Sequence, residues 1–206
     1  MYLSQLKLNP RHRRARIEMA DRYELHRTLL KAFPPTLPAD ERVLYRVETD
    51  HTTGAATVLL QSVHAPNWDA ADHLHSTGYL LEAPQIRPVT PAVEAGARLP
   101  FRLQANPTVK RDGKRHALYA DDALLAWIQR KGQQHGFAVD ALELRVNKMG
   151  NMHGKNGSRR MTWHVVQFDG ILQVTDNDTF AAALIGGIGS AKSFGCGLIS
   201  VPYRSA

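Results

Sequence analysis

PVTPAVEAGA, residues 88–97, divides the sequence into two parts of similar length. Pro88, Pro91 and Gly96 interrupt helices and strands, so this stretch is predicted to be a linker. On both sides of it the sequence pattern predicts the order strand-helix-strand-strand-helix-strand, which is the order of a ferredoxin-like domain. We therefore expect an α+β protein of two tandem ferredoxin-like (RRM-like, β-α-β-β-α-β) domains, at residues 1–90 and 98–206.

The elements of each part follow from the spacing of apolar residues and from the positions of proline and glycine. In the first part we expect strands at 2–8, 42–48, 56–63 and 79–86, one long helix at 14–33 and a short helix at 69–75. In the second part we expect strands at 99–105, 137–146, 161–173 and 198–201, and helices at 121–135 and 176–185. Asp121 is a predicted N-cap, Gly136 follows the end of the same helix, and residues 147–160 are predicted to form a hairpin loop.

The charge balance indicates a polyanionic partner. The chain has 26 Lys and Arg against 19 Asp and Glu, a formal net charge of +7 with histidine neutral. A basic domain of this kind concentrates nucleic acid around itself. Cys196 is the only cysteine, which excludes an intrachain disulfide framework and a multi-cysteine metal cluster. No apolar run is long enough for a signal peptide or a spanning helix, so a cytoplasmic protein without membrane contacts is expected.

Three short stretches concentrate the positive charge at predicted loops or element ends. Such segments suit the phosphates of a duplex groove or a stem-loop, although a solvated surface remains the alternative for any one of them. Few aromatic residues flank them, which favours a folded RNA over an open strand. The stretches are Arg11, Arg13, Arg14 and Arg16; Lys110, Arg111, Lys114 and Arg115; and Lys148, Lys155, Arg159 and Arg160.

The string GIGSAKSFGCG, residues 187–197, is the most specific motif. Gly187, Gly189, Gly195 and Gly197 surround Lys192, and a glycine-rich loop with a lysine can cradle a phosphate. It is not a Walker loop, which has glycine directly before its lysine, nor a dinucleotide fingerprint, which would have its third glycine where Lys192 stands. A structural glycine turn is the alternative.

This glycine pattern, followed by Leu198, resembles the signature loop of the CRISPR repeat endoribonucleases. Four further strings resemble the CasE branch of that family, which belongs to type I-E Cascade, and they occur in the expected order. They are MYLSQLKLNP at 1–10, YELHR at 23–27, FRLQANP at 101–107 and AWI at 126–128. The resemblance implies two ferredoxin-like domains that bind the CRISPR repeat stem-loop, cut at the 3′ base of the stem and keep the product within Cascade.

The resemblance also implies a site. Its catalytic histidine falls on His26, with Tyr23 three residues earlier, and Arg27 of the same string is expected to bind RNA. RNA can be cut without metal when its own 2′-hydroxyl attacks the adjacent phosphorus, which gives a 2′,3′-cyclic phosphate and a 5′-hydroxyl. A histidine moves protons at neutral pH, and Lys192 is a candidate for stabilising the added charge or for binding alone.

Several alternatives remain open from the residues themselves. Helical spacing places His26 among Leu25, Leu29 and Leu30, so a core histidine is the competing interpretation. His73 and His75 are a weak alternative as metal ligands, because no further ligand stands out; no metal and no cofactor is expected. The competing function is a non-catalytic RNA-binding subunit of a CRISPR ribonucleoprotein, and a general DNA-binding protein is a third class.

Overall fold

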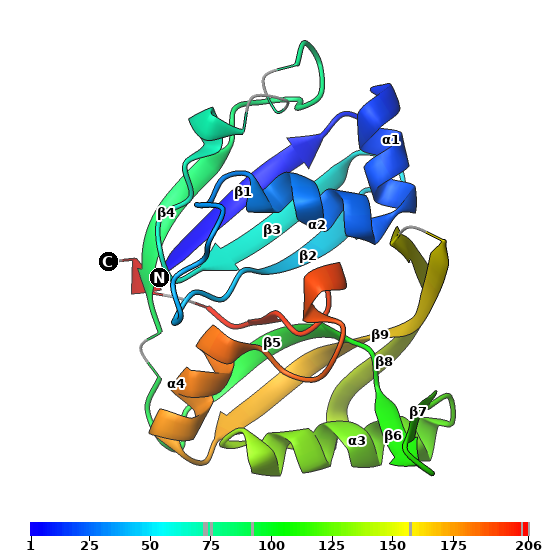
Figure 1. Cartoon of the computed structure of the whole chain (residues 1–206). Coiled ribbons are helices and arrows are strands. Elements are labelled where there is room, and N and C mark those ends of the chain that lie inside the picture. The colour runs from blue at the N-terminus through cyan, green and yellow to red at the C-terminus, as the bar shows by residue number, and fades with distance from the viewer. Residues whose placement is uncertain (72–73, 75, 92, 157, 203, 206) are drawn as a thin grey trace. The chain divides into compact units, whose positions relative to one another are not determined.

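The computed structural model describes residues 1–71, 74, 76–91, 93–156, 158–202 and 204–205, and the contacts between residues divide it into two compact units (Figure 1). The first unit comprises Met1–Val89, His153–Thr162 and Ser193–Gly195. The second comprises Thr90–Met152, Trp163–Lys192 and Cys196–Ala206. Each unit therefore takes in more than one stretch of the chain, which the division at residues 88–97 did not anticipate.

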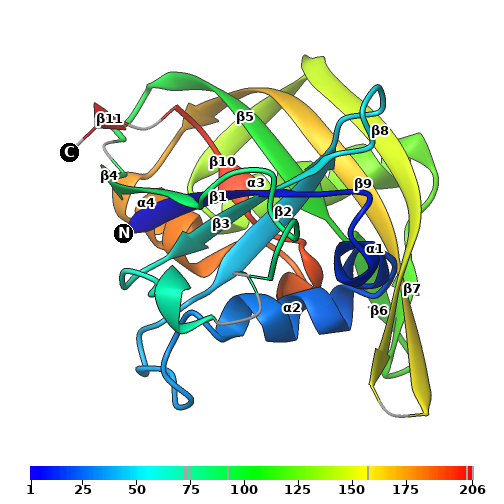
Figure 2. The same ribbon diagram turned by 90° about the horizontal axis from the view of Figure 1, so that it is seen from above.

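An antiparallel sheet with the neighbour order β4-β1-β3-β2 forms the base of the first unit. The order is that of a ferredoxin-like domain, and Figures 1 and 2 show α2 lying along one face of the strands. Apolar side chains of the strands and of α2 form the core between them, with Leu6, Leu25, Leu29, Tyr45 and Leu60 almost fully buried. The elements are β1 (Tyr2–Leu8), α1 (Arg13–Ala20), α2 (Arg22–Leu30), β2 (Leu44–Thr49), β3 (Ala56–Ser62), the 3₁₀ turn η1 (Trp68–Ala70) and β4 (Gln85–Thr90).

The second unit repeats the pattern with the neighbour order β10-β5-β9-β8. Its core gathers Leu103, Ile128, Phe168, Phe180 and Leu184 from the sheet and two helices. The α+β class with two tandem ferredoxin-like arrangements is thus confirmed. The elements are β5 (Arg98–Ala105), β6 (Thr108–Arg111), β7 (Lys114–Ala117), α3 (Asp121–Gln134), β8 (Phe137–Asn156), β9 (Arg159–Val174), α4 (Asn177–Gly186), the 3₁₀ turn η3 (Lys192–Phe194), β10 (Ile199–Ser200) and β11 (Arg204–Ser205).

The single long helix expected at residues 14–33 is wrong, because the chain breaks it at Asp21. Asp21 has extended backbone angles, φ −123° and ψ 99°, so it ends α1 and begins α2. Its carboxylate accepts a hydrogen bond from the backbone N–H of Tyr23 (3.0 Å). Aspartate favours this N-cap position because its side chain satisfies one of the N–H groups that the first turn leaves unpaired.

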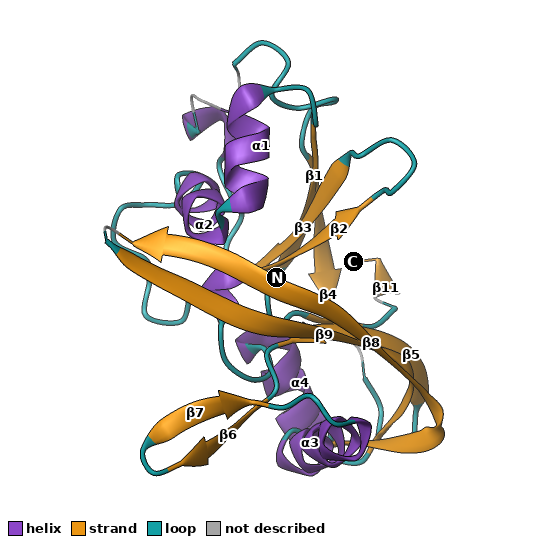
Figure 3. Cartoon of the chain, turned by 90° about the vertical axis from the view of Figure 1, so that its right-hand side faces the viewer, coloured by secondary structure: helices purple, strands orange, loops and turns teal. Residues whose placement is uncertain are grey.

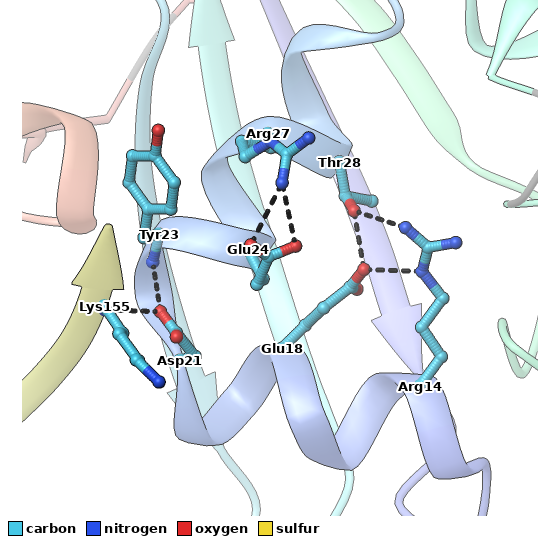
Figure 4. Close-up of polar contacts among 8 residues, drawn as sticks. All are labelled: Arg14, Glu18, Asp21, Tyr23, Glu24, Arg27, Thr28 and Lys155. Carbon is cyan, nitrogen blue, oxygen red and sulfur yellow. Dashed lines mark hydrogen bonds and ion pairs between the residues drawn. The ribbon is translucent and has the colours of Figure 1, made fainter. Parts of the chain in front are cut away.

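Glu18 joins these two helices through a buried carboxylate (Figure 4). Its side chain is almost completely buried and accepts hydrogen bonds from Arg14 Nε (2.7 Å) and Thr28 Oγ1 (2.5 Å). The hydroxyl of Tyr79 donates a third hydrogen bond to the same carboxylate. Burial and the adjacent charge of Glu18 raise the pKa of Tyr79, which therefore stays protonated as the donor. A carboxylate with three donors tolerates burial because its charge is compensated.

The second and third basic stretches lie largely in β-strands and not in the expected loops. Residues 147–160 do not form a loop, because β8 continues to Asn156 and β9 begins at Arg159. Lys110 to Arg115 form the tip of the β6–β7 hairpin, which Figure 3 shows beside α3. The hairpin turn consists of Asp112 and Gly113, both with positive φ (48° and 75°). An Asp-Gly pair between two strands is a strong hairpin signal, so this element was readable in the sequence.

Three smaller expectations also change. Residues 79–86 are not a strand as a whole, since β4 starts at Gln85 and runs to Thr90, into the predicted linker. Asp121 is not an N-cap; it is the first residue of α3, and Ala120 at the cap position offers no side-chain hydrogen bond. Gly136 does follow α3, with φ 72°. Of the short helix expected at 69–75, η1 covers the beginning, and Asp72, His73 and His75 lie outside the described residues.

Within the part of the chain that the structure describes, no helix has the length and apolar character needed to span a membrane.

Replacing Glu18 by alanine is expected to lower the free energy of unfolding by about 2–4 kcal/mol, since it leaves the buried hydroxyl groups of Thr28 and Tyr79 and the partly exposed guanidinium of Arg14 without their shared acceptor. Urea denaturation followed by circular dichroism measures the change. Glu24→Ala is the matched control. Among the described residues, the Glu24 carboxylate makes only an exposed ion pair with Arg27 (3.1 Å), so its loss should change the unfolding free energy by less than about 0.5 kcal/mol. Equal losses for the two variants would contradict the role of Glu18.

Candidate functional site

His26 lies on α2 with one side of its ring enclosed by the first unit. Its ring stacks on that of Tyr45, with the centroids 6.2 Å apart and the planes at 14°. Nδ1 is buried and has no hydrogen-bond partner among the described residues. Burial lowers the pKa of His26 below its ordinary value, because a low-dielectric environment disfavours the charged form. The imidazole is therefore neutral at pH 7 and suited to accept a proton.

Tyr45 is the support under His26. It projects from β2 and is completely buried. Its hydroxyl lies 3.2 Å from the carbonyl oxygen of Arg22 and 3.3 Å from that of Ser193. On its ring, Gly195 approaches so closely that an added Cβ would stand 3.1 Å from a ring carbon. Part of the glycine-rich string thus packs against the residue that supports His26, within the same unit.

Tyr23 precedes His26 by about one helical turn and is half-buried. Figure 4 shows its ring pointing away from the carboxylates of Asp21 and Glu18, while its backbone N–H donates to Asp21. The same Asp21 oxygen accepts a hydrogen bond from the backbone N–H of Lys155 (3.2 Å). Asp21 therefore ties the start of the helix that bears Tyr23 and His26 to the basic end of β8.

Arg14 and Arg27 already have carboxylate partners. Arg14 pairs with Glu18, and Arg27 pairs with Glu24. Arg13 is exposed and lines, with Arg14 and His12, a groove of about 390 Å³ beside α1. Arg13 is thus placed more openly for an anion than the other two.

The residues of the third basic stretch belong to different units and differ in their contacts. Lys148 forms an ion pair with Asp121 (2.7 Å) in the second unit. Lys155 and Arg160 are exposed near the end of the β8–β9 hairpin, in the first unit. The side chain of Arg159 lies outside what the structure describes.

The second basic stretch and the glycine-rich loop meet in the second unit. Arg115 lines a cavity of about 620 Å³ together with Gly187, Gly189 and Lys192. Lys110, Arg111 and Lys114 are exposed on the same hairpin but do not line this cavity. Gly197 has a packing role, since an added Cβ would stand 2.9 Å from the carbonyl oxygen of Ile188.

The sequence interpretation overlooked three further residues of this cavity. Arg130 and Lys131 come from the C-terminal part of α3, and His135 directly follows its last residue. All three line the cavity, and no acidic residue is among its described lining residues. Their signal was present as a run of basic residues near a helix end, at spacings that return to a similar face of the helix. The apolar residues of the same helix, which form its core face, dominate its sequence pattern.

Comparison with known proteins gives consistent results over the whole chain. The family model described as CRISPR associated protein matches residues 1–202. The CRISPR-associated endoribonuclease Cse3 of Thermus thermophilus is 36% identical over 98% of this chain and 99% of its own length. The CRISPR system Cascade subunit CasE of Escherichia coli is 30% identical, with 98% of each chain covered. A solved structure of the CRISPR endoribonuclease Cse3 bound to a 19 nt RNA superposes with a TM-score of 0.86, at 33% identity, over 98% of this chain and 100% of that one.

Gly195→Ala is expected to disturb the support of His26. Gly195 has φ 86°, and the added methyl group would press on the Tyr45 ring, so we expect about 1–3 kcal/mol lower stability and impaired function of the His26 site. Thermal unfolding and an activity assay on RNA measure the two effects. Gly186→Ala is the control, because nothing lies within 4 Å of its added Cβ and its φ is not positive. If both variants behaved like the unmodified protein, the close approach of Gly195 to Tyr45 would not contribute to stability or to the His26 site.

Proposed function

The chain belongs to the family of CRISPR associated proteins, and from that premise we propose that it is an endoribonuclease acting on CRISPR RNA. It binds the stem-loop of the repeat, cuts precursor RNA at the 3′ base of the stem and keeps the product within a Cascade complex. The observation that carries this proposal is the full-length similarity to the endoribonuclease Cse3, combined with a neutral, supported histidine at His26. The partner complex is inferred from the similarity to CasE, a Cascade subunit.

The proposed reaction needs no metal, because the nucleophile belongs to the RNA itself. The 2′-hydroxyl oxygen attacks the adjacent phosphorus while Nε2 of His26 takes its proton. The bond from phosphorus to the 5′-oxygen of the next nucleotide then breaks, and that oxygen gains a proton. The products are a 2′,3′-cyclic phosphate and a 5′-hydroxyl.

Other residues bind the RNA and align its attack. Tyr23 is proposed to donate a hydrogen bond to an oxygen of the scissile phosphate, since its ring points away from the carboxylates of Asp21 and Glu18 (Figure 4). Lys155 and Arg160 at the hairpin end are proposed to hold the RNA backbone, because exposed cations on an extended hairpin can follow phosphates. Lys192 is assigned to binding, since its ammonium group donates to the carbonyl oxygen of Gly186 (2.6 Å).

One observation favours the second candidate, an RNA-binding subunit without catalysis. The enclosed Nδ1 of His26 and its stacking on a fully buried tyrosine also fit a histidine that only fills the core. Measuring both cleavage and binding of the same RNA distinguishes the two functions, because a non-catalytic subunit would bind the RNA without cutting it.

The protein is expected to cut its repeat hairpin in excess EDTA, and a single 2′-deoxy substitution at the cut site should abolish cleavage because it removes the nucleophile. His26→Ala should lower the single-turnover rate at least about 100-fold while the hairpin still binds, in line with general acid–base contributions. Gel analysis of end-labelled RNA measures both. His51→Ala is the control, as His51 is exposed in the turn between β2 and β3. Unchanged cleavage by His26→Ala would remove His26 from the mechanism, and loss of cleavage in EDTA would disprove metal independence.

The pH dependence of kcat/KM gives an independent check. Because burial lowers the pKa of His26, the neutral base is present at pH 7 and is lost only as the pH falls through a value below about 6.5. We expect kcat/KM to be level near neutrality and to fall with a slope of one on the acid side, with its midpoint below pH 6.5. Cleavage rates from pH 4.5 to 8 measure the profile. A midpoint at pH 7 or above would be incompatible with a buried neutral base.

A further inference from the structure

The cavity of about 620 Å³ in the second unit is built from three separate segments. Residues 187–192 of the glycine-rich loop form one wall, the C-terminal part of α3 forms a second, and Arg115 of the β6–β7 hairpin contributes from a third. We call it the α3 pocket. It contains neither His26 nor Tyr23, so it is a different site from the one assigned to cleavage.

Positive charge converges on the α3 pocket. Arg115, Arg130, Lys131 and Lys192 line it, together with His135, and no carboxylate is among its described lining residues. These cations repel one another. The pKa of His135 is lowered mainly by burial and further by the charges of Lys131 and Lys192. The pKa of Lys131 is lowered mainly by burial and further by the charge of Arg130. Like charges gathered around a partly enclosed space destabilise a fold through their mutual repulsion. An anion bound in that space would offset this repulsion.

The backbone of the loop is shaped for the same ligand. Gly187, Gly189 and Ala191 all have positive φ (71°, 86° and 61°). Ala191 is not a glycine, so this conformation strains its backbone, which an ordinary connecting turn has no need to do. The N–H groups of Gly187 and Ile188 donate to the carbonyl oxygens of Ala183 and Gly197. An anion would therefore meet the loop at residues 189–192, where positive φ can turn an N–H group toward it. Lys192 closes the loop by donating to Gly186, so the wall is held in place.

The lining suits a phosphate group better than a nucleobase. A base would need an open aromatic face, but Trp127, which lines the pocket, is only 2% exposed. Gly189 covers its ring so closely that an added Cβ would stand 3.3 Å from a ring carbon. The accessible groups are guanidinium, ammonium and imidazole donors, which match phosphate oxygens. A cavity of this size also accommodates the neighbouring sugar.

We propose that the α3 pocket binds one backbone phosphate of the RNA substrate, using Arg130 and Lys131 as a second anchor besides the residues that act at the cut. The inference rests on the proposed RNA substrate. It adds Arg130 and Lys131 to the glycine-rich loop and Arg115, which the sequence motifs already indicated as candidates for phosphate binding.

The test uses the full chain and its repeat hairpin with a 2′-deoxy group at the cut site, so that binding is measured without cleavage. The double variant Arg130→Gln and Lys131→Gln should weaken binding about 10–100-fold at 0.15 M salt. The slope of log affinity against log salt should become shallower by about one to two, as expected for lost phosphate contacts. Arg87→Gln with Arg145→Gln is the control of equal charge change, since both arginines are exposed and outside the pocket; it should weaken binding less than about threefold.

A methylphosphonate scan identifies the phosphate. One neutral substitution along the RNA should weaken binding by the unmodified protein but not by the double variant, because the contact is then already lost. Equal losses in the pocket and control variants, or a scan that affects both proteins alike at every position, would overturn the inference. The proposed function is judged separately: if the unmodified protein binds and cuts the hairpin while the double variant binds it equally well, only the α3 pocket is refuted. If the unmodified protein does not bind the hairpin, both proposals fail.

Discussion

The buried carboxylate of Glu18 is the interaction on which the first unit depends. A charge in the interior is tolerated only when donors surround it, and here the donors come from α1, from α2 and from Tyr79. The three segments are therefore held at one point by charge-assisted hydrogen bonds, which are shorter and more directional than apolar contacts. Thr28, one of the donors, is two residues from His26. The direction of the helix that carries the proposed catalytic residue is thus set by a polar contact in the core, while the apolar residues Leu25 and Leu29 supply the packing.

His26 satisfies both interpretations that the sequence left open. It has a core histidine's surroundings on one side, with Nδ1 enclosed and the ring against Tyr45. The same enclosure gives it the properties of a base, since desolvation keeps the imidazole neutral and stacking fixes its orientation. Burial at this position is therefore compatible with the proposed catalytic role of His26. Gly195 belongs to the same arrangement, because its missing side chain allows the loop to approach the Tyr45 ring.

The sequence predicted the elements whose signals are local. The strands at 2–8 and 56–63, the helix at 121–135 and the β-α-β-β-α-β order came from apolar spacing, and they agree with β1, β3 and α3 within a residue or two. Errors arose where a single polar residue or a long-range pairing decides the outcome. Asp21 breaks a helix that apolar spacing would continue, and cross-strand pairing extends β8 and β9 through a stretch rich in glycine and asparagine. The α3 pocket could not be predicted from spacing, because its walls come from segments about 15 to 75 residues apart in the chain.

Synthesis on the ribosome places a constraint on this architecture. The first unit includes His153–Thr162 and Ser193–Gly195, so its contacts are incomplete when its first 89 residues have emerged. Tyr45 reaches its carbonyl partner at Ser193 only after nearly the whole chain has been made. Loop closure over such a separation is slow compared with local folding. A nascent chain can therefore form the β4-β1-β3-β2 sheet early, whereas the contacts of Tyr45 with Ser193 and Gly195 form only after these two residues have been made.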